Sequence, residues 1–463
     1  MPPCRSIRIL ALACVLTVPA SPAMAQESEG FHFGSYGRVR AATDLRGGGP
    51  QYGNLVAHGS RLDSEPYLEL EFREVQYPDD KNKDLRVRVV STLAFAGDPF
   101  HYTGRWESHM ALRNMFVDVQ GVGDKGLTLW AGARMYRGDD IYLLDFWPLD
   151  NLNTVGAGAV LDVGSGTRVQ AHVGSNRLLD SDFQYQARLV PSRDDFGTDL
   201  AVTLDRPRVL ASTKITQYFN GFQAVRGFKS SLVAEGHYLP EGVRETSDNT
   251  VRPSHRLPTD TGFVLGAQAT GYGFGERDGH VHLFLRYARG VAAFGDLATP
   301  SLLDAKSKAK ASEWLFATAG NYEIDRFGIM MGAYARLFDA SLGAEYSANK
   351  YWEGIFVTRP QVYLTEHTAV GTEISYQFKN RKVLDDSGRH RVPSAWRLSF
   401  LPMITPAGWG GYKRPILYGV YTATFRNDAA KDSYPTEDPR SHRSMEHYLG
   451  LHAEWWFNSS SYP

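Results

Sequence analysis

The chain has 463 residues and a formal net charge of −1, with 50 Lys and Arg against 51 Asp and Glu. It is rich in glycine (45 residues) and in aromatic residues (24 Tyr, 24 Phe and 9 Trp). Beyond the N-terminus no apolar run reaches roughly 18 residues, which excludes a membrane-spanning helix there, and the sequence has no basic stripe that would favour nucleic acid as a partner.

Residues 1–25 are predicted to be a secretory signal peptide. Arg5 and Arg8 give a positively charged start, residues 9–18 form a short apolar stretch, and residues 23–25 read Ala-Met-Ala. This order of charge, apolar segment and small-residue cleavage site is typical of exported proteins. We therefore expect the mature protein to begin at Gln26.

The two cysteines support the same division of the chain. Cys4 and Cys14 both lie in the predicted signal peptide. The mature chain, expected to be one domain over residues 26–463, would then contain neither a disulfide nor a cysteine-bound metal.

From residue 31 onward, apolar residues recur at every second position, which is typical of strands with one apolar face. In chain order these positions are Phe31, Phe33, Val39 and Ala41; Leu68, Leu70 and Phe72; Leu85, Val87, Val89, Leu93 and Phe95; Leu127, Leu129, Ala131, Ala133 and Met135; Ile329, Met331, Ala333, Ala335 and Leu337; and Leu449, Leu451, Ala453, Trp455 and Phe457. Residues 176–262 show the pattern less clearly.

The connections between these strands alternate in length. Long ones cover about residues 42–63, 101–111, 137–154, 296–312, 339–353 and 426–446, and short ones cover residues 78–84, 121–126, 164–166 and 323–328. Short turns on one side, long loops on the other and aromatic residues at strand ends are typical of an outer-membrane β-barrel. A soluble sandwich also has a two-residue period, but it explains neither feature.

The length of the chain sets the size of this barrel. At roughly 10 residues per strand plus loops, residues 26–457 suit an antiparallel barrel of about 16–18 strands with a water-filled interior. Such a barrel lies in the outer membrane, and its outer face contacts lipid. Trp455 and Phe457 would face this lipid and Trp456 the lumen.

Several aromatic residues fall on the polar, lumen-facing side of the predicted strands. They are Tyr36, Tyr67, Trp130, Tyr136, Tyr334 and Trp456. Most have a charged neighbour on the same face, as Tyr36 has Arg38 and Tyr67 has Glu69. A flat apolar ring beside hydrogen-bonding groups suits a pyranose sugar, although any single ring is better explained by packing.

The segment LWAGARMYRGDDIYLLDFWPLDNLNTVGAGAVLDV, residues 129–163, resembles the maltoporin-type carbohydrate porins, the LamB-like family. The family pattern W-A-G-K-R-F-Y, followed by an arginine, a D-x4-D pair, aromatic residues and G-x-G-A-G, is matched by Trp130, Ala131, Gly132, Arg134, Tyr136, Asp140, Asp145, Phe146, Gly156 and Gly158. FHFGSYGRVR, SRLDSEPYLELEF and HAEWWF resemble other segments of the family.

This resemblance implies an 18-stranded barrel with an inward-folded third long loop, assembled as a homotrimer. It implies facilitated diffusion of maltodextrins or related oligosaccharides along an aromatic track. The implied track is Tyr36, Tyr67, Trp106, Trp147, Trp352 and Trp456. The implied polar track and constriction are Arg38, Arg61, Glu69, Arg113, Arg137, Asp140 and Asp145.

The constriction segment departs from the family pattern. Gly138 occupies the usual arginine position, with Arg137 beside it, and Trp147 replaces the usual tyrosine. Phe284 is a further candidate for the middle of the track.

Two other functions remain open from the sequence. A general diffusion porin would have the same fold without sugar selectivity, and an outer-membrane hydrolase would add a catalytic site. The aspartates 139, 140 and 145 could suggest a glycosidase, but they lie in the porin-like loop. The histidines show no metal-binding spacing, and we expect no cofactor, no metal and no enzymatic activity.

Overall fold

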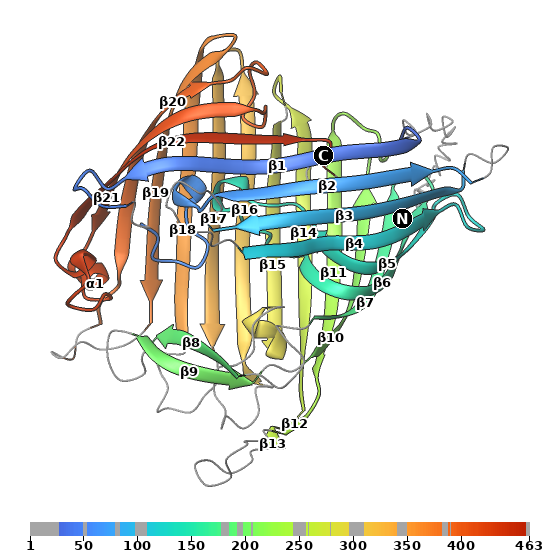
Figure 1. Cartoon of the computed structure of the whole chain (residues 1–463), viewed down its shortest axis with the longest axis horizontal. Coiled ribbons are helices and arrows are strands. Elements are labelled where there is room, and N and C mark those ends of the chain that lie inside the picture. Colours follow the sequence, from blue (N-terminus) through green and yellow to red (C-terminus); the bar gives the residue numbers. More distant parts are fainter. Residues whose placement is uncertain are drawn as a thin grey trace, which may run out of the picture.

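Figure 1 shows the computed structural model of the chain, a single large β-barrel. The structure describes residues 27–49, 53–78, 84–97, 110–176, 207–241, 259–277, 279–295, 310–339, 350–381, 388 and 390–459, and the backbone alone of residues 109, 185–191, 198–204, 242–243 and 256–257. The predicted signal peptide and Trp106 lie outside these residues.

Eighteen strands form the barrel, each antiparallel to its neighbours. In order around the barrel they are β1 (Gly30–Thr43), β2 (Tyr67–Gln76), β3 (Arg86–Ala96), β4 (His109–Gln120), β5 (Leu127–Arg137), β6 (Asn151–Val163), β7 (Thr167–Asn176), β10 (Arg208–Tyr218), β11 (Gly227–Leu239), β14 (Asp260–Phe274), β15 (Gly279–Gly290), β16 (Ser312–Ile324), β17 (Phe327–Asp339), β18 (Lys350–Thr365), β19 (Thr368–Asn380), β20 (Ser394–Ile404), β21 (Ile416–Arg426) and β22 (Met445–Phe457). The first and last strands pair, with Tyr36 opposite Trp456, and this pairing closes the sheet.

Small elements lie in the long loops. They are the hairpins β8–β9 (Tyr185–Pro191 and Thr198–Leu204) and β12–β13 (Gly242–Val243 and Arg256–Leu257), the helix α1 (Asp428–Lys431), and the 3-10 turns η1 (Arg61–Asp63), η3 (Tyr142–Leu144), η4 (Val291–Phe294) and η7 (Pro439–Ser441). No helix among the described residues is long and apolar enough to cross a membrane.

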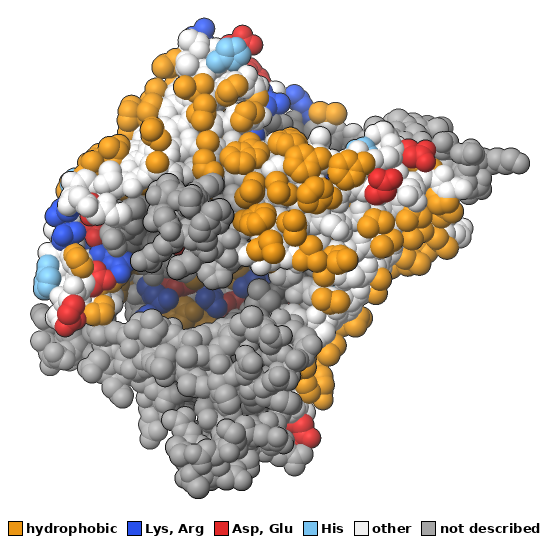
Figure 2. Space-filling view, viewed as in Figure 1, with side chains coloured by type: hydrophobic (Ala, Val, Ile, Leu, Met, Phe, Trp, Pro, Cys, Tyr) orange, Lys and Arg blue, Asp and Glu red, His pale blue; other side chains and the backbone are white. Residues whose placement is uncertain are grey.

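The outer face of the barrel is apolar. Side chains at the predicted lipid-facing positions are exposed, including Phe31, Leu129, Leu337 and Leu451. Figure 2 shows hydrophobic side chains spread over this surface, while a hollow in the same view holds Lys, Arg, Asp and Glu side chains. An apolar outer face and a charged interior are what a bilayer requires of a barrel.

The strand register follows the predicted alternation over most of the barrel, and it shifts near the ends of β14 and β18 and within β4. The pairing of β4 with β3 shifts between Thr92 and Leu93. As a result Arg113 and Asn114 are both buried although they are adjacent in sequence. This bulge brings an arginine into the lumen at a position that strict alternation would assign to lipid.

Two loops fold into the barrel. The third loop, residues 138–150, packs an apolar side against the wall formed by β15 to β18, where Ile141, Leu143 and Leu144 are almost fully buried. The first loop adds Val56 to the same cluster. An apolar core inside a porin barrel narrows the lumen and holds the third loop in a fixed position.

The predicted alternation of connection lengths is wrong at one place. The short turns include residues 164–166, 325–326 and 366–367, but the connection from β20 to β21 on that same side covers residues 405–415. This longer segment, here called the inner turn, also contacts the interior of the barrel.

Candidate functional site

Four aromatic rings form a continuous row across the lumen face of β2, β1 and β22 to the third loop. Ring centroids are 5.8 Å apart for Tyr67 and Tyr36, 6.5 Å for Tyr36 and Trp456, and 6.1 Å for Trp456 and Tyr142. The barrel closure produces the row, because it sets Tyr36 directly opposite Trp456. Tyr67 and Trp456 are half-buried, whereas Tyr36 is only 3% exposed.

Glu454 on β22 organises the polar groups beside this row. Its carboxylate accepts hydrogen bonds from Arg61 at 2.6 Å, from the Tyr142 hydroxyl at 2.6 Å and from Arg414 at 3.0 Å. Tyr36 donates to the same carboxylate at 3.3 Å. One buried anion therefore fixes a loop arginine, the third loop and the inner turn against the aromatic row.

The third loop is also tied to β1 through Arg38, whose guanidinium lies 2.8 Å from the Asp145 carboxylate. Asp145 ends the η3 turn with a positive φ of 50°. Burial alone would raise the pKa of this loop aspartate, but Arg38 and Arg61 lower it to about 2. Asp145 is therefore ionised at neutral pH and holds the loop against the wall.

A second buried pair lies next to Tyr67. Arg113, brought inward by the β4 bulge, forms an ion pair with Glu69 and donates to the Tyr67 hydroxyl, which itself donates to Glu69 at 2.6 Å. The guanidinium also lies over the Tyr67 ring. These contacts fix the orientation of one end of the aromatic row.

The other side of the third loop faces β10 to β14. Asp139 lies 2.7 Å from Lys229, and Asp150 lies 2.6 Å from Lys214. Asp140 is close enough to Arg61, Asp145 and Asp139 to interact with their charges. Burial raises the pKa of Asp140 to about 7, with Asp145 and Asp139 adding to the rise against the attraction of Arg61.

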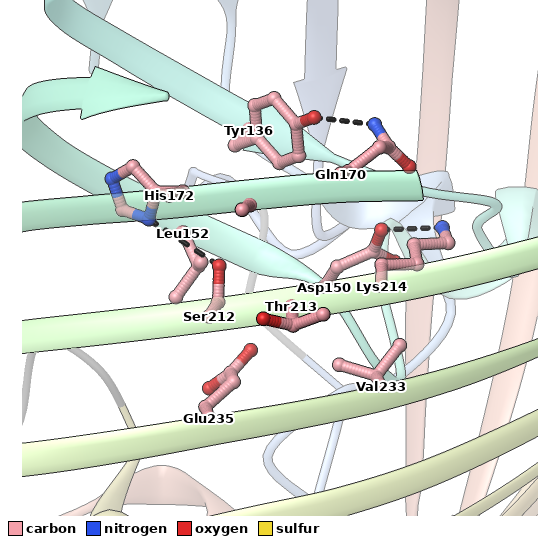
Figure 3. A pocket seen from close by; sticks show the side chains of 11 residues that line it. Tyr136, Asp150, Leu152, Gln170, His172, Ser212, Thr213, Lys214, Val233 and Glu235 are labelled. Atoms are coloured by element: carbon pink, nitrogen blue, oxygen red, sulfur yellow. Dashed lines mark hydrogen bonds and ion pairs between the residues drawn. The ribbon is translucent and has the colours of Figure 1, made fainter. Parts of the chain in front are cut away.

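Figure 3 shows a small niche in the wall near the Asp150–Lys214 pair. Its cavity volume is about 10 Å³, and its lining includes Tyr136, Gln170, His172, Ser212 and Glu235. The rings of Tyr136 and His172 in this lining stack on each other and on the ring of Trp130. A space of this size holds about one water, so the niche is a packed part of the wall.

Most of the predicted polar residues meet at this site. Three residues of the predicted track, Tyr36, Tyr67 and Trp456, form the aromatic row together with Tyr142. The predicted polar residues beside this row are Arg38, Arg61, Glu69, Arg113, Asp140 and Asp145. The structure thus assembles these nine predicted residues from both chain ends, β4, the first loop and the third loop.

Two predicted track residues do not join the row. Trp352 lies on the outer face, 41% exposed, because it shares parity with lipid-facing Phe356, so its assignment to the lumen is wrong. Trp147 is buried beneath Arg137, whose guanidinium is 3.6 Å from the ring centre. The assignment of Trp106 to the track stays a prediction, because this residue lies outside the described ranges. Phe284, the further candidate, is buried in the apolar core against the third loop.

The sequence-based prediction missed Tyr142, Glu454 and the inner-turn residues Tyr412 and Arg414. Tyr142 lies in the apolar run IYLL of a long connection, where an apolar run already indicates burial. Glu454 shares the lumen parity of Trp456 and could have been found by the same rule. The inner turn gave no signal, because a Gly- and Pro-rich stretch is typical of any loop.

No group of three or more potential metal ligands occurs within the described ranges. The site combines a row of tilted and edge-on aromatic rings, fixed ion pairs and one carboxyl of raised pKa. This arrangement can contact a polar solute with apolar faces, and it resembles a binding surface along a pore.

Comparison with known proteins gives one family and several distant structures. The family model described as LamB porin matches residues 31–457. Among solved structures, OccK3 of Pseudomonas aeruginosa is 9% identical over 92% of this chain and 95% of its own (TM-score 0.42). OccAB2 of Acinetobacter baumannii is 12% identical over 93% and 98% (TM-score 0.43), and OmpT of Vibrio cholerae is 12% identical over 93% and 99% (TM-score 0.35).

No curated protein matches the sequence. The family match alone spans nearly the whole barrel, from the start of β1 to the end of β22. The chain therefore belongs to the LamB porin family and is a channel-forming porin of the outer membrane.

Proposed function

We propose that this porin is a sugar-selective channel that allows facilitated diffusion of maltodextrins or related oligosaccharides. The observation that supports this proposal is the continuous row of Tyr67, Tyr36, Trp456 and Tyr142 with charged groups along its edge. A pore that only passed small ions would need no such row.

The chemistry of a sugar fits both parts of the site. The apolar face of a pyranose ring can lie on the half-exposed rings of Tyr67 and Trp456, and the nearly buried Tyr36 supports them from between. The hydroxyl rim can exchange water for hydrogen bonds to Arg38, Asp140 and Asp145. Each step along the row replaces one set of contacts by an equivalent one, so the solute moves without an energy source.

The test is the conductance of single channels in a planar bilayer, titrated with maltotriose, sucrose and lactose. We expect saturable block by at least one of these sugars. Because contact with an aromatic ring contributes about 0.5–1.5 kcal/mol, Trp456→Ala or Tyr67→Ala should weaken the block by about twofold to twelvefold.

The chain offers a matched control in Trp352, which is a tryptophan on the outer face. Trp352→Ala should leave the block unchanged. Conductance that no sugar affects would favour the general diffusion porin instead, and a protein without conductance would reopen the hydrolase alternative.

We also propose that the porin assembles as a homotrimer. On the outer face, small residues of β1 and β21, including Ala41 and Gly419, leave a shallow apolar groove beside Leu451. Apolar side chains of an adjacent subunit would pack into this groove. Native mass spectrometry of the detergent-solubilised protein tests this, and a monomeric mass would contradict it.

A further inference from the structure

The inner turn, residues 405–415, lies across the end of the barrel where the short turns are. One part of it is attached near the ends of β16 and β18. The Trp409 indole donates to the Thr365 carbonyl at 2.7 Å and stacks on Tyr363 with centroids 5.6 Å apart. The Gly411 amide donates to the Glu323 carboxylate at 2.6 Å, and the Gly410 amide donates to the Tyr363 hydroxyl at 3.0 Å.

Glycine is required for this path. Gly408 and Gly410 have φ values of 87° and 139°, which other residues rarely adopt. A Cβ on Gly411 would lie 3.1 Å from the Met330 sulfur. The backbone of the inner turn therefore lies directly against the side chains of Met330 and Glu323 on the wall.

The other part of the inner turn reaches β15 on one side and β22 on the other. The Tyr412 ring lies 5.6 Å from that of His280 on β15. Arg414 lies 2.9 Å from the carboxylate of Glu454 on β22, and its guanidinium is 4.2 Å from the Trp456 ring centre. The segment thus spans the interior from β15 to β22.

The inner turn also contacts the tip of the third loop directly. The rings of Tyr412 and Tyr142 are 5.4 Å apart in an edge-on arrangement, and Arg414 donates to the Tyr142 hydroxyl. Tyr412 therefore extends the aromatic row by one ring beyond the third loop. Both segments form hydrogen bonds to the same buried carboxylate, that of Glu454.

We propose that the inner turn forms a second constriction of the channel, with Tyr412 as the pore-lining residue and Arg414 and Trp409 as positioning residues. The third loop narrows the lumen from one end and the inner turn from the other, and the two meet at Tyr142. The proposal rests on channel activity, not on sugar selectivity, so it can be tested with salt alone.

The test uses cysteine substitution, which is specific because Cys4 and Cys14 lie in the predicted signal peptide. Tyr412→Cys should raise single-channel conductance in KCl by about 1.5-fold, because it removes a ring from a narrow part of the pore. Modification of the introduced thiol with a bulky trimethylammonium methanethiosulfonate should return the conductance to the original level or below. A purely structural residue would show no such rescue.

Phe222 provides the matched control. It is an aromatic residue in another short-side turn, and its ring packs on Tyr218 at 5.3 Å and under the Arg168 guanidinium at 5.4 Å, away from the third loop. Phe222→Cys should change the conductance neither before nor after modification. Labelling of each cysteine is verified by mass spectrometry.

A Tyr412→Cys channel with unaltered conductance, or one fully labelled without a change in conductance, would overturn the proposal. Should that variant fail to fold, Lys413→Cys takes its place, because Lys413 is exposed and its substitution removes no side-chain anchor. Labelled Lys413→Cys should then conduct less than the unlabelled channel, and equal conductance would be the contrary result.

Discussion

Asp140 is a loop carboxyl whose charge changes near neutral pH. Burial raises its pKa to about 7; Arg61 and Arg137 favour the ionised form, and Asp145 and Asp139 oppose it. Below this pKa the group is neutral, and above it the group adds a negative charge to the lumen. A negative charge in the lumen attracts cations and repels anions, so ionisation of Asp140 should change the ion selectivity of the channel.

We therefore expect the preference for cations over anions to increase as pH rises from about 5 to 9, with a midpoint near the pKa of Asp140. Reversal potentials under a KCl gradient measure this preference. Asp140→Asn should remove the titration. Asp139→Asn is the control, because Lys229 outweighs burial and keeps the pKa of Asp139 well below its usual value, so the pH dependence should remain.

At the residue scale, the sequence predicted well which strand residues face the lumen, but it predicted poorly which side chains contact one another. Parity placed Tyr36, Tyr67 and Trp456 in the lumen, since alternation depends only on the strand itself. Trp352 was assigned to the lumen by resemblance, and its own parity contradicts that assignment. Contacts such as Arg414 with Glu454 join segments that are distant in sequence, so no local pattern reports them.

At the scale of elements, the position of the third loop depends on a glycine in the barrel wall. Gly332 on β17 lies under Ile141, and a Cβ at this glycine would come within 2.5 Å of the Ile141 Cγ2 atom. The glycine thus provides the space in which the loop sits.

Gly332→Ala should displace the third loop or strain the wall, and it should lower the free energy of unfolding by about 1–3 kcal/mol. Urea titration of the protein in detergent measures this, and single-channel recordings should show altered conductance. Gly320→Ala on β16 is the matched control, because its Cβ would have no neighbour closer than 3.4 Å. Equal stability of the two variants would contradict the prediction.

The sequence predicted some strands poorly because their apolar and polar residues do not alternate regularly. In β10, Leu210 is fully buried on the lumen side while Ala211 and Thr213 face outward, so the apolar and polar faces are hard to distinguish. The bulge in β4 shifts the pattern by one residue. Strong alternation elsewhere, as in β5 and β17, allowed the fold class to be predicted without a structure.

At the scale of the whole molecule, buried ion pairs occur around the lumen wall. Examples are Arg286 with Glu313, Arg359 with Glu373 and Arg397 with Asp63. Pairing of this kind leaves little unbalanced charge on the wall, which suits passage of an uncharged solute.

The start of the mature chain is a further prediction at this scale. Glu27 already contacts the barrel, since its side chain lies 2.7 Å from Arg73 and its carbonyl accepts a hydrogen bond from Tyr77 at 2.7 Å. We expect the intact mass of the purified protein to correspond to a first residue of Gln26. A mass that includes residues 1–25 would refute the proposed cleavage.

The pairing of β1 with β22 has a consequence for biosynthesis. The edge of β1 has no partner until the last strand has been exported, so a chain that stops before about residue 445 leaves a row of unpaired backbone groups. Hydrocarbon cannot satisfy such groups, and a partial barrel has no stable place in a bilayer. Stable insertion therefore requires the C-terminal strand. Until that strand is available, the unpaired strand edges make the chain prone to aggregation, and chaperones must protect it.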